Sequence, residues 1–173
     1  WRFVLGPWQH PDVASDRLPK DDDVRDVGAW RADVPVGTWQ HFDVSARPLG
    51  TTEYEDGKPV RGLRVTWHPT GKKATEGRWS LDGDEGVCLV WHPNGALRYS
   101  TTYAKGVRNG AYREQREDGT TAEEGGYRDG QRDGAWKHYD VKGRVSSEGP
   151  YVADARHGAW KEYDEGRLAA QGT

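Results

Sequence analysis

The sequence repeats itself about every 24 residues, and this periodicity limits the possible folds more than any other feature. A glycine opens each of six similar segments, and successive opening glycines lie 25, 24, 24, 24 and 24 residues apart. The opening glycines are Gly37, Gly62, Gly86, Gly110, Gly134 and Gly158. A period of this length indicates small supersecondary units that each bury their apolar surface against the next unit.

Each repeat has the residue pattern of a β-hairpin. One aromatic residue usually lies two residues after the opening glycine, and another lies seventeen residues after it, as Trp136 and Tyr151 do. Turn-forming pairs such as Asn94-Gly95 separate two strand-like halves, neither of which shows the period of a helix. We therefore predict an all-β fold: an elongated, twisted, single-layer antiparallel β-meander built from tandem 24-residue β-hairpin repeats.

Glycine also recurs in the second half of the repeat, two residues before the aromatic residue. It stands there at Gly77, Gly125 and Gly149. Bare backbone at these positions leaves room for a ring from the adjacent strand. Because a single hairpin is not stable in water, we expect contacts between the rings of successive hairpins to stabilise the array.

The predicted domain organisation is one continuous domain of six hairpin repeats over residues 37–173, preceded by an atypical capping repeat over residues 1–36. Gly6-Pro7-Trp8 resembles the opening of a repeat, and Trp30 occupies the position of a second aromatic residue. An acidic insertion with Asp21-Asp22-Asp23 lies between them. The chain begins with Trp rather than Met, which suggests that a leader or upstream segment was removed. The sequence leaves the compartment open, and the expectation is a soluble protein that is either cytoplasmic or exported after removal of an N-terminal segment.

The composition excludes several classes of protein. A net charge of -3 with interleaved Arg and Asp offers no basic surface for nucleic acid. No apolar run approaches the roughly 18 residues of a membrane span. Cys88 is the single cysteine, which excludes an internal disulfide and a thiolate zinc cluster. We expect no cofactor, because no phosphate-binding loop or zinc-protease motif is present.

The unit Gly-x-Trp-x-x-Tyr-x-x-x-Gly, followed by Gly-x-Tyr-x-x-Gly, resembles the MORN repeat, and the spacing of about 24 residues resembles its bacterial variant. The resemblance covers Gly37–Thr173, with a weaker copy before it. Arg64 and Cys88 replace the first aromatic residue in their repeats, and Gln115 replaces a later one, so an interrupted row of rings is expected. The resemblance implies a β-hairpin array with a binding or scaffolding role, and some bacterial members are antitoxin components of toxin pairs.

Neither a catalytic site nor a metal site is predicted. His68 and His92 occupy equivalent turns about 10 Å apart, too far to share an ion, and are expected to stabilise turns or face solvent. Acidic side chains such as Glu114 and Glu123 are expected in exposed rows mixed with arginines, rather than as a carboxylate pair in a pocket. Cys88 is interpreted as a small buried hydrophobic residue.

The aromatic residues are the candidates for a binding face, and Trp39, Tyr112, Trp136 and Trp160 are chosen for it. If exposed, these rings would bind a partner, whereas rings packed between hairpins would be core. We expect a non-catalytic repeat scaffold that binds a partner protein through the aromatic face or an edge of the sheet. A toxin would be that partner if the chain is an antitoxin or immunity component. The alternative is a cell-wall, glycan- or choline-binding module with exposed Trp and Tyr.

Overall fold

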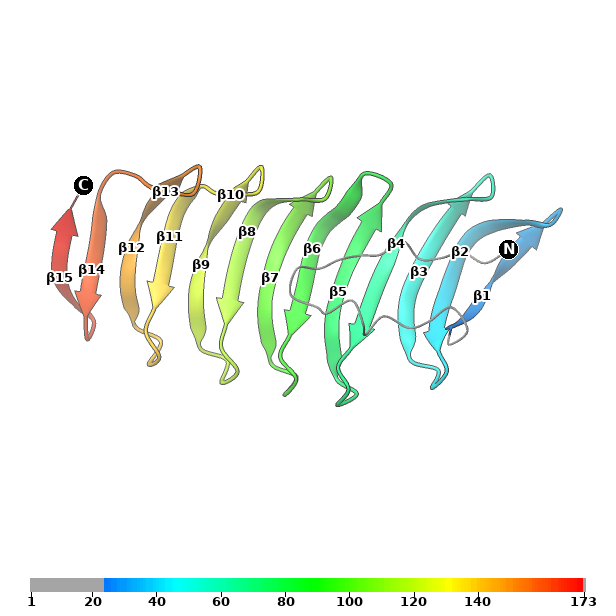
Figure 1. Ribbon diagram of the computed structural model, residues 1–173, viewed down its shortest axis with the longest axis horizontal. Helices are drawn as coiled ribbons and strands as arrows, with labels where there is room; N and C mark the ends of the chain where they lie inside the picture. Colours follow the sequence, from blue (N-terminus) through cyan, green and yellow to red (C-terminus); the bar gives the residue numbers. More distant parts are fainter. Residues whose placement is uncertain (1–23, 173) are drawn as a thin grey trace.

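The computed structural model describes residues 24–172, which form one antiparallel sheet and contain no helix. Figure 1 shows the hairpins side by side in a row, from β1 (Val24–Arg31) at one end to β15 (Arg167–Gly172) at the other. The predicted single-layer, all-β meander is confirmed. Within this part of the chain, no helix is available to cross a membrane.

Two strands belong to each repeat, and they pair with their neighbours in the order of the sequence. The two-residue strands β10 and β13 lie off this path and pair with β9 and β12. The strands between the two ends are β2 (Val34–Asp43), β3 (Pro48–Glu55), β4 (Lys58–Trp67), β5 (Lys73–Ser80), β6 (Gly83–Trp91), β7 (Leu97–Ala104), β8 (Val107–Gln115), β9 (Thr121–Arg128), β10 (Gln131–Arg132), β11 (Gly134–Tyr139), β12 (Val145–Val152), β13 (Ala155–Arg156) and β14 (Trp160–Asp164).

The two ends of the hairpins use different turns. At one end, two residues with positive φ connect the strands, as Asp56 (φ 48°) and Gly57 (φ 75°) do between β3 and β4, a geometry that matches the twist of paired strands. At the other end the predicted Asn-Gly turn is longer. The Gly95 N–H donates to the His92 carbonyl, and the His92 N–H donates to the Ala96 carbonyl, both at 2.8 Å. The hairpin that the Asn-Gly pair predicts is confirmed, and its turn lies between Trp91 and Leu97.

The core lies on one face of the sheet. We call this the ring face, because it carries the residue two positions after each opening glycine. Its buried apolar side chains are Trp39, Tyr54, Cys88, Val90, Tyr99, Tyr112, Trp136 and Trp160. The opposite face carries partly exposed ion pairs such as Lys137 with Glu148, whose charged atoms are 3.9 Å apart. Rings from successive strands therefore cover one another on one side of a single layer.

Strand β1 occupies the place of a second strand in the repeat frame. Trp30 of this strand packs edge-on against Trp39 of β2, with ring centroids 5.0 Å apart. This is the place that the repeat spacing predicts for Trp30. Gly6-Pro7-Trp8 and Asp21-Asp22-Asp23, the other parts of the predicted capping repeat, lie outside the described residues, and the boundary after residue 36 stays a prediction.

Candidate functional site

The four aromatic residues predicted for a binding face lie on the ring face, and all four are buried. Trp136 is 1% exposed, Trp160 6%, and Trp39 and Tyr112 each 8%. These four rings therefore pack between hairpins as part of the core, which was the alternative to an exposed binding face. A partner would meet the groups that surround these rings, and direct contact with the rings stays a prediction.

Each tryptophan in the last two repeats lies over a glycine of the preceding second strand. A Cβ atom on Gly125 would lie 2.3 Å from the Trp136 ring, and one on Gly149 would lie 2.4 Å from the Trp160 ring. No side chain fits between ring and backbone there. The predicted reason for these two glycines is confirmed.

The same prediction is wrong at Gly77, because the neighbouring side chain is the thiol of Cys88 and not a ring. A Cβ atom on Gly77 would lie 3.3 Å from its Sγ atom. The sequence reasoning also missed Gly28, which lies under Trp39, where a Cβ atom would be 2.1 Å from the ring. The signal was present, since Gly28 precedes its opening glycine by the same nine residues as Gly125 does.

The rings form two separate stretches. At the start of the sheet, Trp30, Trp39 and Tyr54 are neighbours, with centroids 5.0 and 5.8 Å apart. From β7 onward a longer stretch has neighbouring centroids 5.1 to 6.0 Å apart. Its members are Tyr99, Tyr112, Tyr127, Trp136, Tyr151 and Trp160. Arg64 and Cys88 lie between the two stretches, so the predicted interruption is confirmed there. It is wrong for the repeat with Gln115, because Tyr112 and Tyr127 of that repeat continue the longer stretch.

Arginines cover the rings of the last repeats. The Arg132 guanidinium carbon lies 4.3 Å from the centroid of the Trp136 ring, and that of Arg156 lies 3.9 Å from the Trp160 centroid. Such cation–π contacts stabilise a buried ring and hold the cation in place. The sequence analysis predicted the arginines only as part of an exposed surface of mixed charge. The signal for this contact was the arginine that precedes the opening glycine by two residues in each of the last three repeats.

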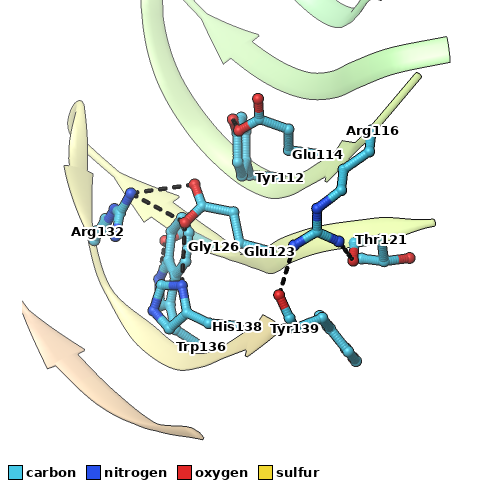
Figure 2. A network of polar contacts seen from close by, with 10 residues as sticks. All are labelled: Tyr112, Glu114, Arg116, Thr121, Glu123, Gly126, Arg132, Trp136, His138 and Tyr139. Atoms are coloured by element: carbon cyan, nitrogen blue, oxygen red, sulfur yellow. Dashed lines mark hydrogen bonds and ion pairs between the residues drawn. The ribbon is translucent and has the colours of Figure 1, made fainter. Parts of the chain in front are cut away.

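Figure 2 shows a polar network around Glu123 on the ring face. Arg132 donates through Nη2 to both Glu123 oxygens, at 3.1 and 3.3 Å, and Nδ1 of His138 lies 3.2 Å from Glu123 Oε2. The His138 ring is stacked between Trp136 and Trp160. Burial lowers the pKa of His138 and outweighs the opposing effect of the Glu123 carboxylate. The neutral ring is therefore favoured, with its Nδ1–H directed at Glu123.

The network differs from the predicted rows of exposed acids. The Glu123 side chain is 17% exposed, and it lies opposite Glu114 of the neighbouring strand. The Tyr112 hydroxyl donates to Glu114 Oε2 at 2.9 Å. Burial, together with this bond, raises the pKa of Tyr112. Because each carboxylate has its own donors, the pair braces the hairpins and lacks the divided roles of an acid–base couple.

A groove of about 600 Å³ opens on the ring face beside this network, near the longer turns of β5 to β9. Small apolar side chains of Ala74, Val90 and Ala122 line it together with Trp91. Its polar lining includes His92, Arg98, Glu114, Arg116 and Glu117. Sequence reasoning missed this groove. The sequence feature that could have revealed it lies twelve residues after each opening glycine. At this position Arg98 replaces the alanine found in both adjacent repeats.

The histidines of the turns connect successive repeats. Nε2 of His68 bonds to the Trp91 carbonyl oxygen at 2.8 Å, and Nε2 of His92 bonds to the Gln115 carbonyl oxygen at 2.9 Å. Arg116 makes the equivalent bond to the next repeat, from Nη2 to the Tyr139 carbonyl oxygen at 2.6 Å. The predicted turn-stabilising role of both histidines is confirmed, and it extends from each turn to the one after it.

The single cysteine lies in the core of the sheet. Cys88 is 3% exposed, and burial, with a further effect of Asp84, raises its pKa to about 12. It packs as the small hydrophobic residue that the sequence predicts. Among residues 24–172, no group of three or more His, Cys, Asp or Glu side chains could hold a metal ion.

Comparison with known families gives one match. Residues 84–105, which contain β6 and β7, match the family model described as MORN repeat variant. This match confirms the resemblance to the MORN-repeat family that the repeat pattern indicated. The matched hairpin includes Cys88, so the family pattern holds even in a repeat that lacks the first aromatic residue.

No curated protein sequence matches the chain. Solved structures with some likeness include TarM, at 11% identity and a TM-score of 0.35 over 64% of this chain and 20% of that one. A mutant of S. aureus TarM with Fondaparinux, alpha-GlcNAc-glycerol and UDP gives the same identity and score over 65% and 20%. Accessory secretory proteins 1, 2 and 3 of Streptococcus pneumoniae give 14% identity and a TM-score of 0.22 over 66% and 19%. The chain spans about a fifth of these proteins, and likeness this low supports no conclusion about function.

Proposed function

Because the chain carries a MORN-variant repeat within a hairpin array, we propose that it is a non-catalytic scaffold that binds a partner protein through the groove on its ring face. The single observation that carries this proposal is the groove itself. Its volume of about 600 Å³ lies in the range of ligand-binding sites, and its lining combines an apolar floor with a few polar groups. Antitoxin or immunity activity would be the case in which the partner is a toxin.

The position of the groove on strands favours recognition without rearrangement. Ala74, Val90, Arg98, Glu114 and Ala122 come from the five consecutive strands β5 to β9. Side chains on paired strands are held more firmly than side chains on loops, so little ordering is needed when a partner binds. A segment of a partner protein is the occupant that such a surface fits.

A choline- or glycan-binding module is less well supported by the same geometry. Sites for quaternary ammonium groups use ring faces that are open to the ligand. In the last two repeats, the guanidinium groups of Arg132 and Arg156 already occupy such positions over Trp136 and Trp160. The ligand cation would have to displace these arginines.

The proposal is tested by blocking the groove in the full chain. Ala122→Arg places a long side chain in the groove, whereas Ala135→Arg makes the same change at an exposed position on the opposite face. Both variants and the wild type are used for co-purification from the native host with quantitative mass spectrometry. We expect a partner that is retained by the wild type and by Ala135→Arg but is lost with Ala122→Arg.

A partner that binds all three proteins equally would contradict the groove as the binding surface. Circular dichroism of both variants provides the folding control, because a variant that unfolds would lose its partner for an unrelated reason. If Ala122→Arg fails this control, Ala122→Gln tests the same position with a smaller, uncharged side chain.

A further inference from the structure

Arg98 is the one charged residue at its position in the repeat. The residues twelve positions after the first five opening glycines are Leu49, Ala74, Arg98, Ala122 and Ser146. Arg98 lines the groove and is partly buried there. Its ring contact is with the adjacent Tyr99, at 5.8 Å from the centroid. Across residues 24–172, its guanidinium makes no hydrogen bond or ion pair.

The other charged groups of the groove are engaged. The two Nη atoms of Arg116 donate to the carbonyl oxygens of Thr121 and Tyr139, at 2.7 and 2.6 Å. Glu114 accepts the Tyr112 hydroxyl hydrogen bond. Glu117 stands at the rim, 71% exposed and with Oε1 4.0 Å from His92 Nδ1. Among the described residues that line the groove, Arg98 is therefore the charged side chain whose hydrogen-bond donors are left for a ligand.

We propose that the groove recognises an acidic segment of the partner protein, with Arg98 binding an Asp or Glu carboxylate of that segment. This inference rests on the proposed function and adds the chemistry of the partner to it. An arginine fork matches a carboxylate with two parallel hydrogen bonds, and a half-buried site strengthens each of them. Glu114 can accept a further bond through Oε1, which suits a peptide N–H of the same segment.

A peptide fits this arrangement better than an anionic membrane surface does. Membrane recognition relies on clusters of basic residues, whereas this chain has a net charge of -3 and the two arginines that line the groove are accompanied there by Glu114 and Glu117. A peptide supplies a carboxylate for Arg98, an N–H for Glu114 and apolar atoms for the floor of Ala74, Val90 and Ala122. Binding to a membrane is therefore an outcome of the test and not part of the proposal.

The test begins with the full chain immobilised and exposed to a phage-displayed library of random dodecapeptides. We expect enriched peptides to carry Asp or Glu. The strongest is then synthesised with a fluorescent label, together with a copy in which Gln or Asn replaces each acid. Fluorescence polarisation measures the affinity of both peptides for the wild type, Arg98→Ala, Arg98→Lys and Arg78→Ala. Arg78 is an exposed arginine of β5 on the opposite face, so its replacement is the matched charge control.

Arg98→Ala is expected to weaken binding of the acidic peptide about 10- to 100-fold, the usual range for losing a hydrogen bond to a charged group. It should leave the amide peptide unchanged. Arg98→Lys keeps the charge without the fork and should lose less, and Arg78→Ala should lose almost nothing. The alanines at the equivalent positions of the adjacent repeats indicate that the fold tolerates Arg98→Ala.

Three results would overturn the inference. The enriched peptides could lack acidic residues and yet fail to bind Ala122→Arg. The groove would then remain the binding surface, but Arg98 would have no role in recognition. Acidic peptides that bind Arg98→Ala as tightly as they bind the wild type would likewise remove the role of Arg98. No enrichment over empty beads would overturn both proposals, and binding to phosphatidylserine vesicles in that case would assign the groove to a membrane surface.

Discussion

The last two repeats and the two central repeats share one backbone frame but fill their ring faces differently. In the repeats opened by Gly134 and Gly158, a tryptophan lies over a glycine and under an arginine. In the repeats opened by Gly62 and Gly86, Arg64 and Cys88 occupy the ring position, and Asp84 stands where the last repeats have their arginine. The hairpin is kept in both regions, although the contacts between hairpins differ.

The comparison shows that the ring and the arginine above it change together between the two regions, whereas the glycine below is kept at Gly77 in the repeat with Cys88. An arginine over the ring is useful only where the ring is present, so the repeat with Cys88 has no need of one. Asp84 meets a different requirement, because burial lowers the pKa of Arg64 and the charge of Asp84 opposes that effect. The turn geometry and the strand pairing are independent of these exchanges, which is why the repeat frame continues through the central region.

The largest difference in stability between the two regions is expected when the side chain at the ring position is replaced by alanine. Trp136→Ala should reduce the free energy of unfolding by about 3–5 kcal/mol, since it removes a large side chain that is 1% exposed. Cys88→Ala removes only a sulfur atom at the equivalent position and should cost about 1 kcal/mol, comparable with one buried methylene group. Urea denaturation followed by circular dichroism measures both. Equal losses would show that the two regions do not differ in the way described.

A smaller contrast concerns the glycines beneath those positions. Gly125→Ala should destabilise the protein by about 1–3 kcal/mol, because the added Cβ would lie 2.3 Å from the wide Trp136 ring. Gly77→Ala meets a thiol at 3.3 Å, and the reduced freedom of the unfolded chain offsets that contact. We expect its stability to lie within about 0.5 kcal/mol of the wild type. Thermal unfolding of both variants would reveal any reversal of this order.

Removal of the arginine above the ring should have a more moderate effect. Arg132→Ala loses the contact with Trp136 and the bonds to Glu123, which together are worth about 1–2 kcal/mol at a partly buried site. Arg78→Ala in the central region changes the same charge at an exposed position and should change stability by less than about 0.5 kcal/mol. If urea denaturation gave the two variants equal stability, Arg132 would be a solvated residue after all.

The last contrast is a dependence of stability on pH that His138 of the C-terminal region contributes. Because the pKa of His138 is lowered in the folded state, its neutral form stabilises the protein above the ordinary histidine value of about 6.5. That stabilisation is lost as the pH falls through the lowered value. The urea midpoint should therefore decrease on acidification below about pH 6.5, and His138→Gln should flatten this part of the profile. An unchanged profile in His138→Gln would assign the acid sensitivity to other groups.

The sequence predicts the frame of this fold better than its surface. Repeated turns and strand lengths are local properties, so the hairpins and the glycines beneath Trp136 and Trp160 follow from spacing alone. The covering arginines and the groove depend on which side chains meet across repeats, and a pattern read one repeat at a time does not reveal this. Arg132 and Arg98 are both arginines at fixed positions in a repeat, yet one covers a ring and the other lines an open groove.

The central claim is that rings packed on bare backbone hold successive hairpins together, and a double-mutant cycle between Gly125 and Trp136 tests it most directly. We expect Gly125→Ala to destabilise the wild type but to have little effect in the Trp136→Ala background, where the added methyl group has space. The coupling energy should reach at least about 1 kcal/mol, as it does for residues in direct contact. Strictly additive effects of the two substitutions would contradict the claim.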